Sequence, residues 1–99
     1  VMGGQYQPVG HAHVLQNIFD FGLSVQESID FPRAFVLENN YKLERSIPNK
    51  VLNELKAIGH NIIYTDEMHG GGQAIFIDRK KGILIGGSDS RKDGSAIGY

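Results

Sequence analysis

Apolar residues spaced at the period of a helix predict two helices in the first third of the chain. The first runs from about Gly10 to Phe21, where the apolar side chains form one stripe. The second is short and begins at Ser24. This serine and Glu27, three residues later, form the pattern of a capping box, and Pro32 ends the helix.

A third helix has the clearest apolar face. It runs from about Pro48 to Ile58, because proline is tolerated in a first helical turn and Gly59 supplies a left-handed stop. The apolar face consists of Val51, Leu52, Leu55 and Ile58.

The remaining segments carry strand patterns. Ala34–Leu37 and Tyr41–Glu44 flank Glu38-Asn39-Asn40 and predict a short hairpin, because asparagine tolerates the positive φ of a tight turn. The further expected strands are Asn61–Tyr64, Gln73–Asp78 and Gly82–Gly86, with Ser95–Tyr99 as a last strand or an extended arm. This order of elements indicates an α+β fold in which helices are layered on an antiparallel sheet.

Composition narrows the functional classes. Ninety-nine residues allow one domain at most. The net charge is −1, from 10 basic and 11 acidic residues that are well mixed, so no basic stripe suggests a nucleic acid partner. No apolar run approaches the roughly 18 residues of a membrane span. The absence of cysteine excludes a disulfide framework, a thiolate metal site and a cysteine nucleophile.

The two ends of the chain differ in character. Val1-Met2-Gly3-Gly4 lacks an initiator methionine and runs from an apolar, strand-like start into a glycine turn, as in the interior of a longer chain. The last third, from Gly70 to Tyr99, resembles the end of a domain. We therefore expect residues 1–99 to be a single C-terminal segment of a larger protein and not a complete domain.

His11 and His13 suggest a metal site that their spacing does not support. Residues two apart on a helix point in different directions, and no third ligand lies at a useful spacing. We expect one solvated histidine, one histidine packed against a neighbour, and no metal.

Two glycine clusters can present backbone N–H groups to an anion. Gly70-Gly71-Gly72 can form a cradle, but no Lys-Ser/Thr pair follows as in a P-loop, and we favour a flexible loop that enters a strand. Successive N–H groups at Gly3-Gly4 can stabilise an oxyanion. The alternative for this pair is a simple turn from strand to helix.

The segment Ser88–Gly94 is dense in polar residues. A serine nucleophile is not expected, because no nucleophile-elbow pattern surrounds Ser88 or Ser90. We expect instead that Asp89 and Arg91 form an ion pair and cap backbone groups at a turn, which fixes how the tail docks.

Five motifs in order resemble one protein family. They are Val1–Pro8 with Gly10-His11 and Val14-Leu15-Gln16; Ile29–Arg33; Ile47-Pro48 with Leu55 and Gly59-His60; Gly72–Ile75; and Gly87–Tyr99. Each motif alone is weak. Together they cover nearly the whole chain and are similar to the late small-subunit segment of γ-glutamyltranspeptidases.

This resemblance implies an N-terminal nucleophile (Ntn) hydrolase with a four-layer αββα sandwich, to which the chain adds outer helices and part of one sheet. In that family a precursor cleaves itself into two subunits, and the N-terminal threonine of the small subunit attacks γ-glutamyl amides such as glutathione. The acyl group passes to water, an amino acid or a peptide. The implied partners are the rest of the small subunit, the large subunit and a γ-glutamyl substrate, without a cofactor.

By the same resemblance, no catalytic residue lies in this chain. Position 1 is Val1, and the only threonine, Thr65, stands mid-chain. The family's arginine for the substrate α-carboxylate lies in the large subunit, and its substrate-binding serine pair lies upstream of Val1. We therefore expect the chain to be inactive alone.

The resemblance does place the family's oxyanion loop in this region. Many members have Pro-Gly-Gly where this chain has Gln5-Tyr6-Gln7, so Tyr6 and Gln7 stand at the two glycines. The N–H groups survive this change, but a positive φ is strained without glycine, and the loop is then rebuilt around Gly3-Gly4. The candidate residues for binding substrate and oxyanion through their backbone are Gly3, Gly4, Tyr6 and Gln7.

Two departures from the family pattern leave other readings open. Ser90 replaces the proline of Asp-Pro-Arg and is expected to loosen a turn without touching the chemistry. The Tyr6-Gln7 change leaves open the alternative that the enzyme is an amide acylase of the same fold, acting on glutaryl- or cephalosporin-type substrates.

A third alternative is a non-catalytic structural fragment. Such a fragment would leave apolar surface exposed at Val14, Ile18, Val51 and Leu55, or would cover it by self-association.

Overall fold

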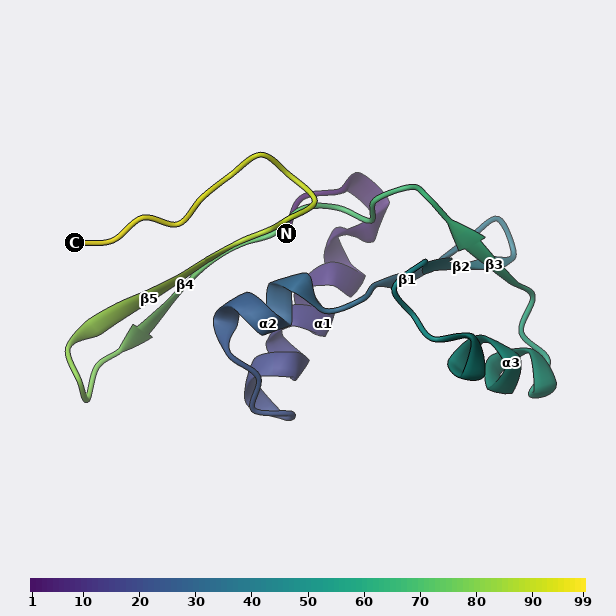
Figure 1. The fold of residues 1–99 in the computed structure, drawn as a ribbon, viewed down its shortest axis with the longest axis horizontal. Coiled ribbons are helices and arrows are strands. Elements are labelled where there is room, and N and C mark those ends of the chain that lie inside the picture. Colours follow the sequence, from purple (N-terminus) through teal and green to yellow (C-terminus); the bar gives the residue numbers. More distant parts are fainter. The chain divides into compact units, whose positions relative to one another are not determined.

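The computed structural model describes residues 1–99 and divides them into two compact units. Unit 1 is Val1–Phe31 together with Gly70–Tyr99, and unit 2 is Pro32–His69. Each unit contains both helix and strand (Figure 1), which confirms the α+β prediction. The elements are η1 (Gly4–Tyr6, a 3₁₀ turn), α1 (Gln7–Phe19), α2 (Val25–Asp30), β1 (Ala34–Leu37), β2 (Asn40–Glu44), α3 (Asn49–Ala57), β3 (Ile62–Thr65), β4 (Gln73–Asp78) and β5 (Ile83–Ser88).

Unit 1 is built from α1, α2 and the antiparallel hairpin β4–β5 (Figure 1). Its core forms where the two helices pack on one face of the hairpin. The buried residues are Val14, Val25 and Ile29, with Ala74 and Phe76 of β4 packed against them. This core joins the first 31 residues to the hairpin β4–β5, which is far away in the sequence.

The first helix begins earlier than its apolar stripe predicts. η1 leads directly into α1, so residues 4–8 are already helical and the predicted start at about Gly10 is wrong. Pro8 lies in the first turn of α1, where its missing N–H loses no hydrogen bond. The apolar stripe gives no signal for residues 4–8, because Tyr6 is the only buried side chain among them.

No helix of the chain has the length and apolar character to cross a membrane.

The capping box of α2 is confirmed. The Ser24 hydroxyl accepts the N–H of Glu27 at 3.2 Å, and the Glu27 carboxylate accepts the N–H of Ser24 at 2.8 Å. The helix ends at Asp30, two residues before Pro32. These reciprocal bonds satisfy two N–H groups that the first turn of a helix leaves without partners.

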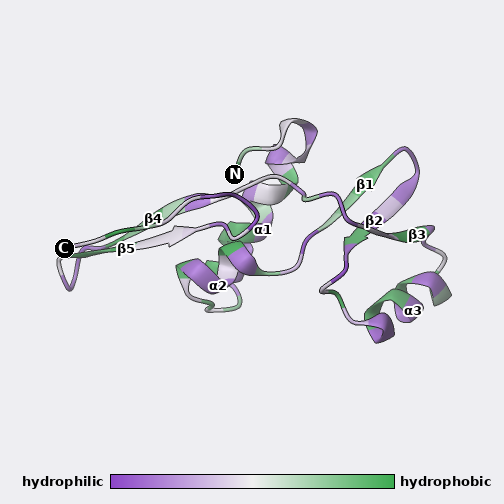
Figure 2. Cartoon of the chain, turned by 45° about the horizontal axis from the view of Figure 1, so that its top comes forward, coloured by the Kyte–Doolittle hydropathy of each residue, from purple (hydrophilic) through white to green (hydrophobic).

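Unit 2 contains the sheet β1-β2-β3 and the helix α3. The hairpin β1–β2 is confirmed, with positive φ at Glu38 (50°) and Asn39 (63°). However, β3 pairs with β2 in parallel. The prediction of an antiparallel sheet is therefore wrong for this pair of strands. Parallel neighbours need a long crossover connection, and α3 supplies it between β2 and β3. Figure 2 shows alternating hydrophobic and hydrophilic bands along α3, whose Leu52 is buried with Leu43 and Ile62.

His69 is buried in unit 2, with its ring against Phe35. Burial lowers the pKa of the His69 imidazole, against the opposing effect of the Glu44 and Glu67 carboxylates. The folded state therefore binds fewer protons at His69 than the unfolded state. The resulting stabilisation is complete above the unfolded-state pKa of about 6.5 and is lost as the pH falls through the lower folded-state pKa.

We predict that His69→Gln flattens the pH dependence of stability on the acid side of neutrality. Glutamine does not titrate, so the variant should lose less of its free energy of unfolding than the parent between about pH 7 and pH 5. Urea unfolding at several pH values measures this slope. Equal slopes for the two proteins would show that His69 keeps an ordinary pKa in the folded state.

The second face of the hairpin β4–β5 is apolar and exposed. Ile75 and Leu84 are 69% and 70% exposed, and Ile77, the cross-strand partner of Leu84, lies on the same face. The tail Ser95–Tyr99 forms no strand and runs back beside the hairpin as an extended arm (Figure 1). A hairpin with apolar residues on both faces is typical of strands that are covered on both sides.

Candidate functional site

The N-terminal turn holds two glycines in the left-handed region of backbone conformation. φ is 135° at Gly3 and 56° at Gly4, values that a residue with a Cβ adopts only with strain. Tyr6 and Gln7 have φ of −74° and −50° and are helical. The positive φ values therefore lie at Gly3 and Gly4, and not at Tyr6 or Gln7.

The four candidate residues differ in how their N–H groups are used. Tyr6 donates to the Gly3 carbonyl at 3.0 Å, and Gln7 donates to the Gly4 carbonyl. The N–H groups of Gly3 and Gly4 make no hydrogen bond within the chain. Both glycines are exposed and lie at the start of a helical segment, where N–H groups and the helix dipole favour negative charge.

The side chain of Tyr6 anchors this turn. Tyr6 is 3% exposed, and its ring lies between two glycines. A Cβ on Gly10 would come within 2.6 Å of the ring, and a Cβ on Gly70 within 2.9 Å. The ring therefore fills the space that these glycines leave open, whereas Gln7 points to the surface.

Gly70–Gly72 lies against the start of the chain. Met2 donates to the Gly71 carbonyl at 2.9 Å, and Gly71 donates to the Met2 carbonyl at 3.3 Å, so the two residues form an isolated antiparallel bridge. The next N–H, that of Gly72, donates to the Asp89 carboxylate at 2.6 Å. The anion that this glycine segment binds is thus a side chain of the same chain.

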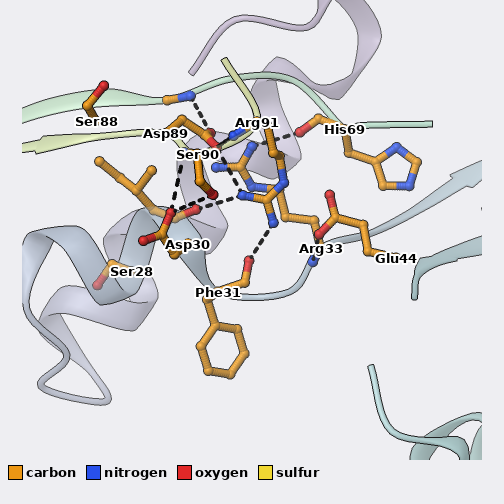
Figure 3. A network of polar contacts seen from close by, with 12 residues as sticks. Ser28, Asp30, Phe31, Arg33, Glu44, His69, Ser88, Asp89, Ser90 and Arg91 are labelled. Atoms are coloured by element: carbon orange, nitrogen blue, oxygen red, sulfur yellow. Dashed lines mark hydrogen bonds and ion pairs between the residues drawn. The ribbon is translucent and has the colours of Figure 1, made fainter. Parts of the chain in front are cut away.

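The ion pair between Asp89 and Arg91 is confirmed, with 3.1 Å between the guanidinium and the carboxylate. Arg91 also donates to the carbonyls of Ile29 and Phe31, each at 3.1 Å, at the C-terminal end of α2 (Figure 3). A cation at this end of a helix satisfies carbonyls that have no partner in the helix. Asp89 and Arg91 therefore attach the C-terminal tail, taken from here on as Ser88–Tyr99, both to Gly72 and to α2.

A second set of contacts in the tail has no signal in the linear sequence. The side-chain amide of Gln26 donates to the Ser88 carbonyl at 2.8 Å and accepts the Ser88 N–H at 3.0 Å, and it also donates to Asp30. This bond from Gln26 lowers the pKa of the Asp30 carboxyl. The Ser90 hydroxyl donates to Asp30 at 3.0 Å (Figure 3), so Ser90 holds the tail.

One histidine of α1 is exposed and the other packs against a neighbouring ring, as predicted. His11 is exposed, and its Nδ1 is 2.7 Å from the Gln7 carbonyl oxygen. His13 is half-buried and packs against the Phe31 ring at 5.8 Å between centroids. The two side chains have separate neighbours.

Comparison with known proteins identifies the family. The model of the family "Gamma-glutamyltranspeptidase" matches residues 1–99. The chain belongs to the γ-glutamyltranspeptidase family. The match covers every motif on which the resemblance depends.

Relatives of this γ-glutamyltranspeptidase-family chain include both hydrolases and acylases. The glutathione hydrolase-like YwrD proenzyme of Bacillus subtilis (strain 168) is 30% identical over 97% of this chain and 20% of its own length. The acylase ACY 1 proenzyme of Pseudomonas sp. (strain V22) is 32% identical over 82% of this chain and 14% of its own length. This chain therefore spans one fifth or less of these two relatives.

The crystal structure of cephalosporin acylase from Bacillus halodurans has the same fold over this segment. It matches 100% of this chain and 20% of its own chain, with a TM-score of 0.90 and 35% identity. The likeness confirms the predicted fold class, a portion of the Ntn-hydrolase fold.

Proposed function

We propose that this chain is the C-terminal part of the small subunit of a self-processing Ntn hydrolase. In this proposal the complete enzyme cleaves γ-glutamyl amides such as glutathione and transfers the acyl group to water, an amino acid or a peptide. The chain contributes sheet strands, packing helices and the oxyanion loop. The nucleophilic threonine and the large subunit come from the rest of the precursor. The small share of each proenzyme relative that the chain spans supports this division.

The observation that carries the proposal is the conformation of Gly3 and Gly4. Attack of a threonine hydroxyl on an amide carbonyl places negative charge on the carbonyl oxygen, and fixed N–H groups stabilise that charge. Gly3 and Gly4 present N–H groups that the chain does not use, at the start of a helical segment. The proposal keeps Gly3, Gly4, Tyr6 and Gln7 as the oxyanion region, and the free N–H groups favour the two glycines as donors.

An amide acylase is the second candidate. Tyr6 and Gln7 replace the two glycines found in many γ-glutamyltranspeptidases, and the matched structure with a TM-score of 0.90 is a cephalosporin acylase. Both activities need the same oxyanion donors, because both break an amide bond through a tetrahedral intermediate. They differ in the acyl group that the rest of the enzyme selects.

The test starts with the native protein that contains this chain. Mass spectrometry of its subunits and their N-termini should reveal a subunit that begins with threonine and contains residues 1–99. The purified enzyme is then assayed with γ-glutamyl anilide and with glutaryl anilide. Faster cleavage of the first supports the γ-glutamyl proposal, and faster cleavage of the second supports the acylase. An unprocessed protein that cleaves neither would leave a structural role.

A control separates the role of this chain from that of the whole enzyme. Residues 1–99 produced alone should cleave neither anilide, because the chain has no N-terminal threonine, serine or cysteine. Activity of the isolated chain would contradict the proposed division of labour.

A further inference from the structure

We propose that Asp89 is a positioning residue for the Gly3–Gly4 turn, on which it acts through the backbone of Gly70–Gly72. The inference rests on the oxyanion role proposed above for that turn. It assigns to the polar tail a part in catalysis that requires no contact with the substrate. All the residues concerned belong to unit 1.

The first link joins the tail to Gly72. Asp89 is 1% exposed, and its Oδ2 accepts the N–H of Gly72 at 2.6 Å, while its own N–H donates to the Gly72 carbonyl at 3.0 Å. Gly72 is itself buried, so its N–H has no access to water as an alternative partner. A hydrogen bond to a carboxylate is short and strong, and the two bonds together fix the position of Gly72.

The second link joins Gly70 and Gly71 to the turn. The bridge between Gly71 and Met2 holds the residue directly before Gly3. Gly3 approaches Gly70 so closely that a Cβ on Gly3 would lie 2.8 Å from the Gly70 Cα. Gly71 is covered from the tail side by the Lys92 side chain, whose Cγ would lie 2.7 Å from a Cβ on Gly71. A displacement of Gly72 would therefore move Gly71 and Gly70, and through them Met2 and Gly3.

The third link orients the carboxylate of Asp89. Its Oδ1 accepts both the backbone N–H of Arg91 at 3.0 Å and the Arg91 guanidinium at 3.1 Å, which leaves Oδ2 directed at Gly72. The guanidinium is in turn held by the carbonyls of Ile29 and Phe31 (Figure 3). Through Arg91, the position of Asp89 is thus fixed relative to α2, which contributes Val25 and Ile29 to the core of unit 1.

The consequence for catalysis follows from the demands of an oxyanion site. Its N–H groups act most strongly in the transition state, and a small error in their position lowers the rate of acylation more than it weakens the binding of substrate. Loss of the Asp89 carboxylate should therefore lower kcat and leave KM almost unchanged. A role in stability alone would change the amount of folded enzyme, and not kcat per folded active site.

The experiment uses the complete processed enzyme with Asp89→Ala and Asp89→Asn, and Asp93→Asn as the control. Asp93 is an exposed aspartate of the same tail, so its change removes the same charge. Rates are divided by the concentration of processed subunit. We expect kcat of Asp89→Ala to fall about 10- to 100-fold with KM within about twofold. Asp89→Asn keeps one oxygen acceptor and should be intermediate, and the control should match the parent enzyme.

Hydrogen–deuterium exchange of the same variants tests the physical coupling without any activity. Exchange should rise in peptides that cover residues 1–6 and 70–72 in both Asp89 variants, and not in the control. Faster exchange confined to the tail, or an unchanged kcat, would overturn the inference. If the parent enzyme cleaves no anilide, the proposed function fails, and the exchange at residues 1–6 still decides whether Asp89 positions the turn. Where the alanine variant does not fold, the asparagine variant carries both measurements.

Discussion

Replacing Gly70 with alanine is expected to lower the free energy of unfolding by about 3–4 kcal/mol. Two effects add at this position. Its φ is +69°, where an L-residue costs about 1–2 kcal/mol. In addition, a Cβ at Gly70 would overlap the carbonyl oxygen of Met2 and come within 2.9 Å of the Tyr6 ring. The Met2 carbonyl is backbone and is held by Gly71, so it cannot move aside without breaking that bridge.

Gly22 offers a matched control for this prediction. Its φ is also +69°, but no atom lies within 4 Å of a Cβ placed there. Gly22→Ala should therefore lose only the conformational cost, about 1–2 kcal/mol. Urea unfolding of the protein that contains this chain measures both variants. Equal losses would show that the contact between Gly70 and Met2 does not constrain the fold.

Truncating Ile29 to alanine is expected to lower the free energy of unfolding by about 2–5 kcal/mol. Ile29 is 1% exposed and forms a core cluster with Val14 and Val25. A Cβ on Gly87 would lie 3.0 Å from its Cδ1, so the side chain rests directly on β5. The shortened side chain leaves a cavity between α2 and the hairpin, and the surrounding structure closes such a cavity only in part.

A graded series separates the cavity from other causes. Ile29→Val removes one methyl group and should cost about 0.5–1.5 kcal/mol, well below the cost of alanine. Chemical denaturation of both variants, with comparison of midpoints at equal slope, gives the two losses. If valine and alanine destabilise equally, the cost does not depend on cavity size and the packing argument is wrong.

Local patterns in the sequence predict most elements and several of their ends. The capping box at Ser24 and Glu27 starts α2 in the structure as it does in the pattern, because each residue of the box bonds only within one helical turn. The turn at Asn39 is predicted for the same reason, since a positive φ is a property of single residues. The pairing of β3 with β2 is not local. Nothing in the residues of either strand indicates whether the partner runs parallel or antiparallel.

In the candidate site, too, some features can be predicted from local sequence and others depend on tertiary contacts. Glycines at positions 3 and 4 indicate where φ can be positive, and the charged pair Asp89 and Arg91 indicates an ion pair two residues apart. That Gly72 is the backbone partner of Asp89, and that Gln26 binds Ser88 across 62 residues, cannot be predicted from either segment. Amide and carboxylate groups bond equally well to many partners, so their choice depends on what the fold brings near.

The sequence by itself determined the family, most of the helix and strand segments, and the glycines at positions 3 and 4, whose φ can be positive. These properties depend on the order of motifs or on interactions within a few residues. Only the tertiary structure decided that Gly70–Gly72 lies on the start of the chain, and that the tail reaches it through Asp89. Such contacts form because burial in one core brings distant backbone N–H groups together and removes water as their partner, and this constraint has no counterpart in local sequence.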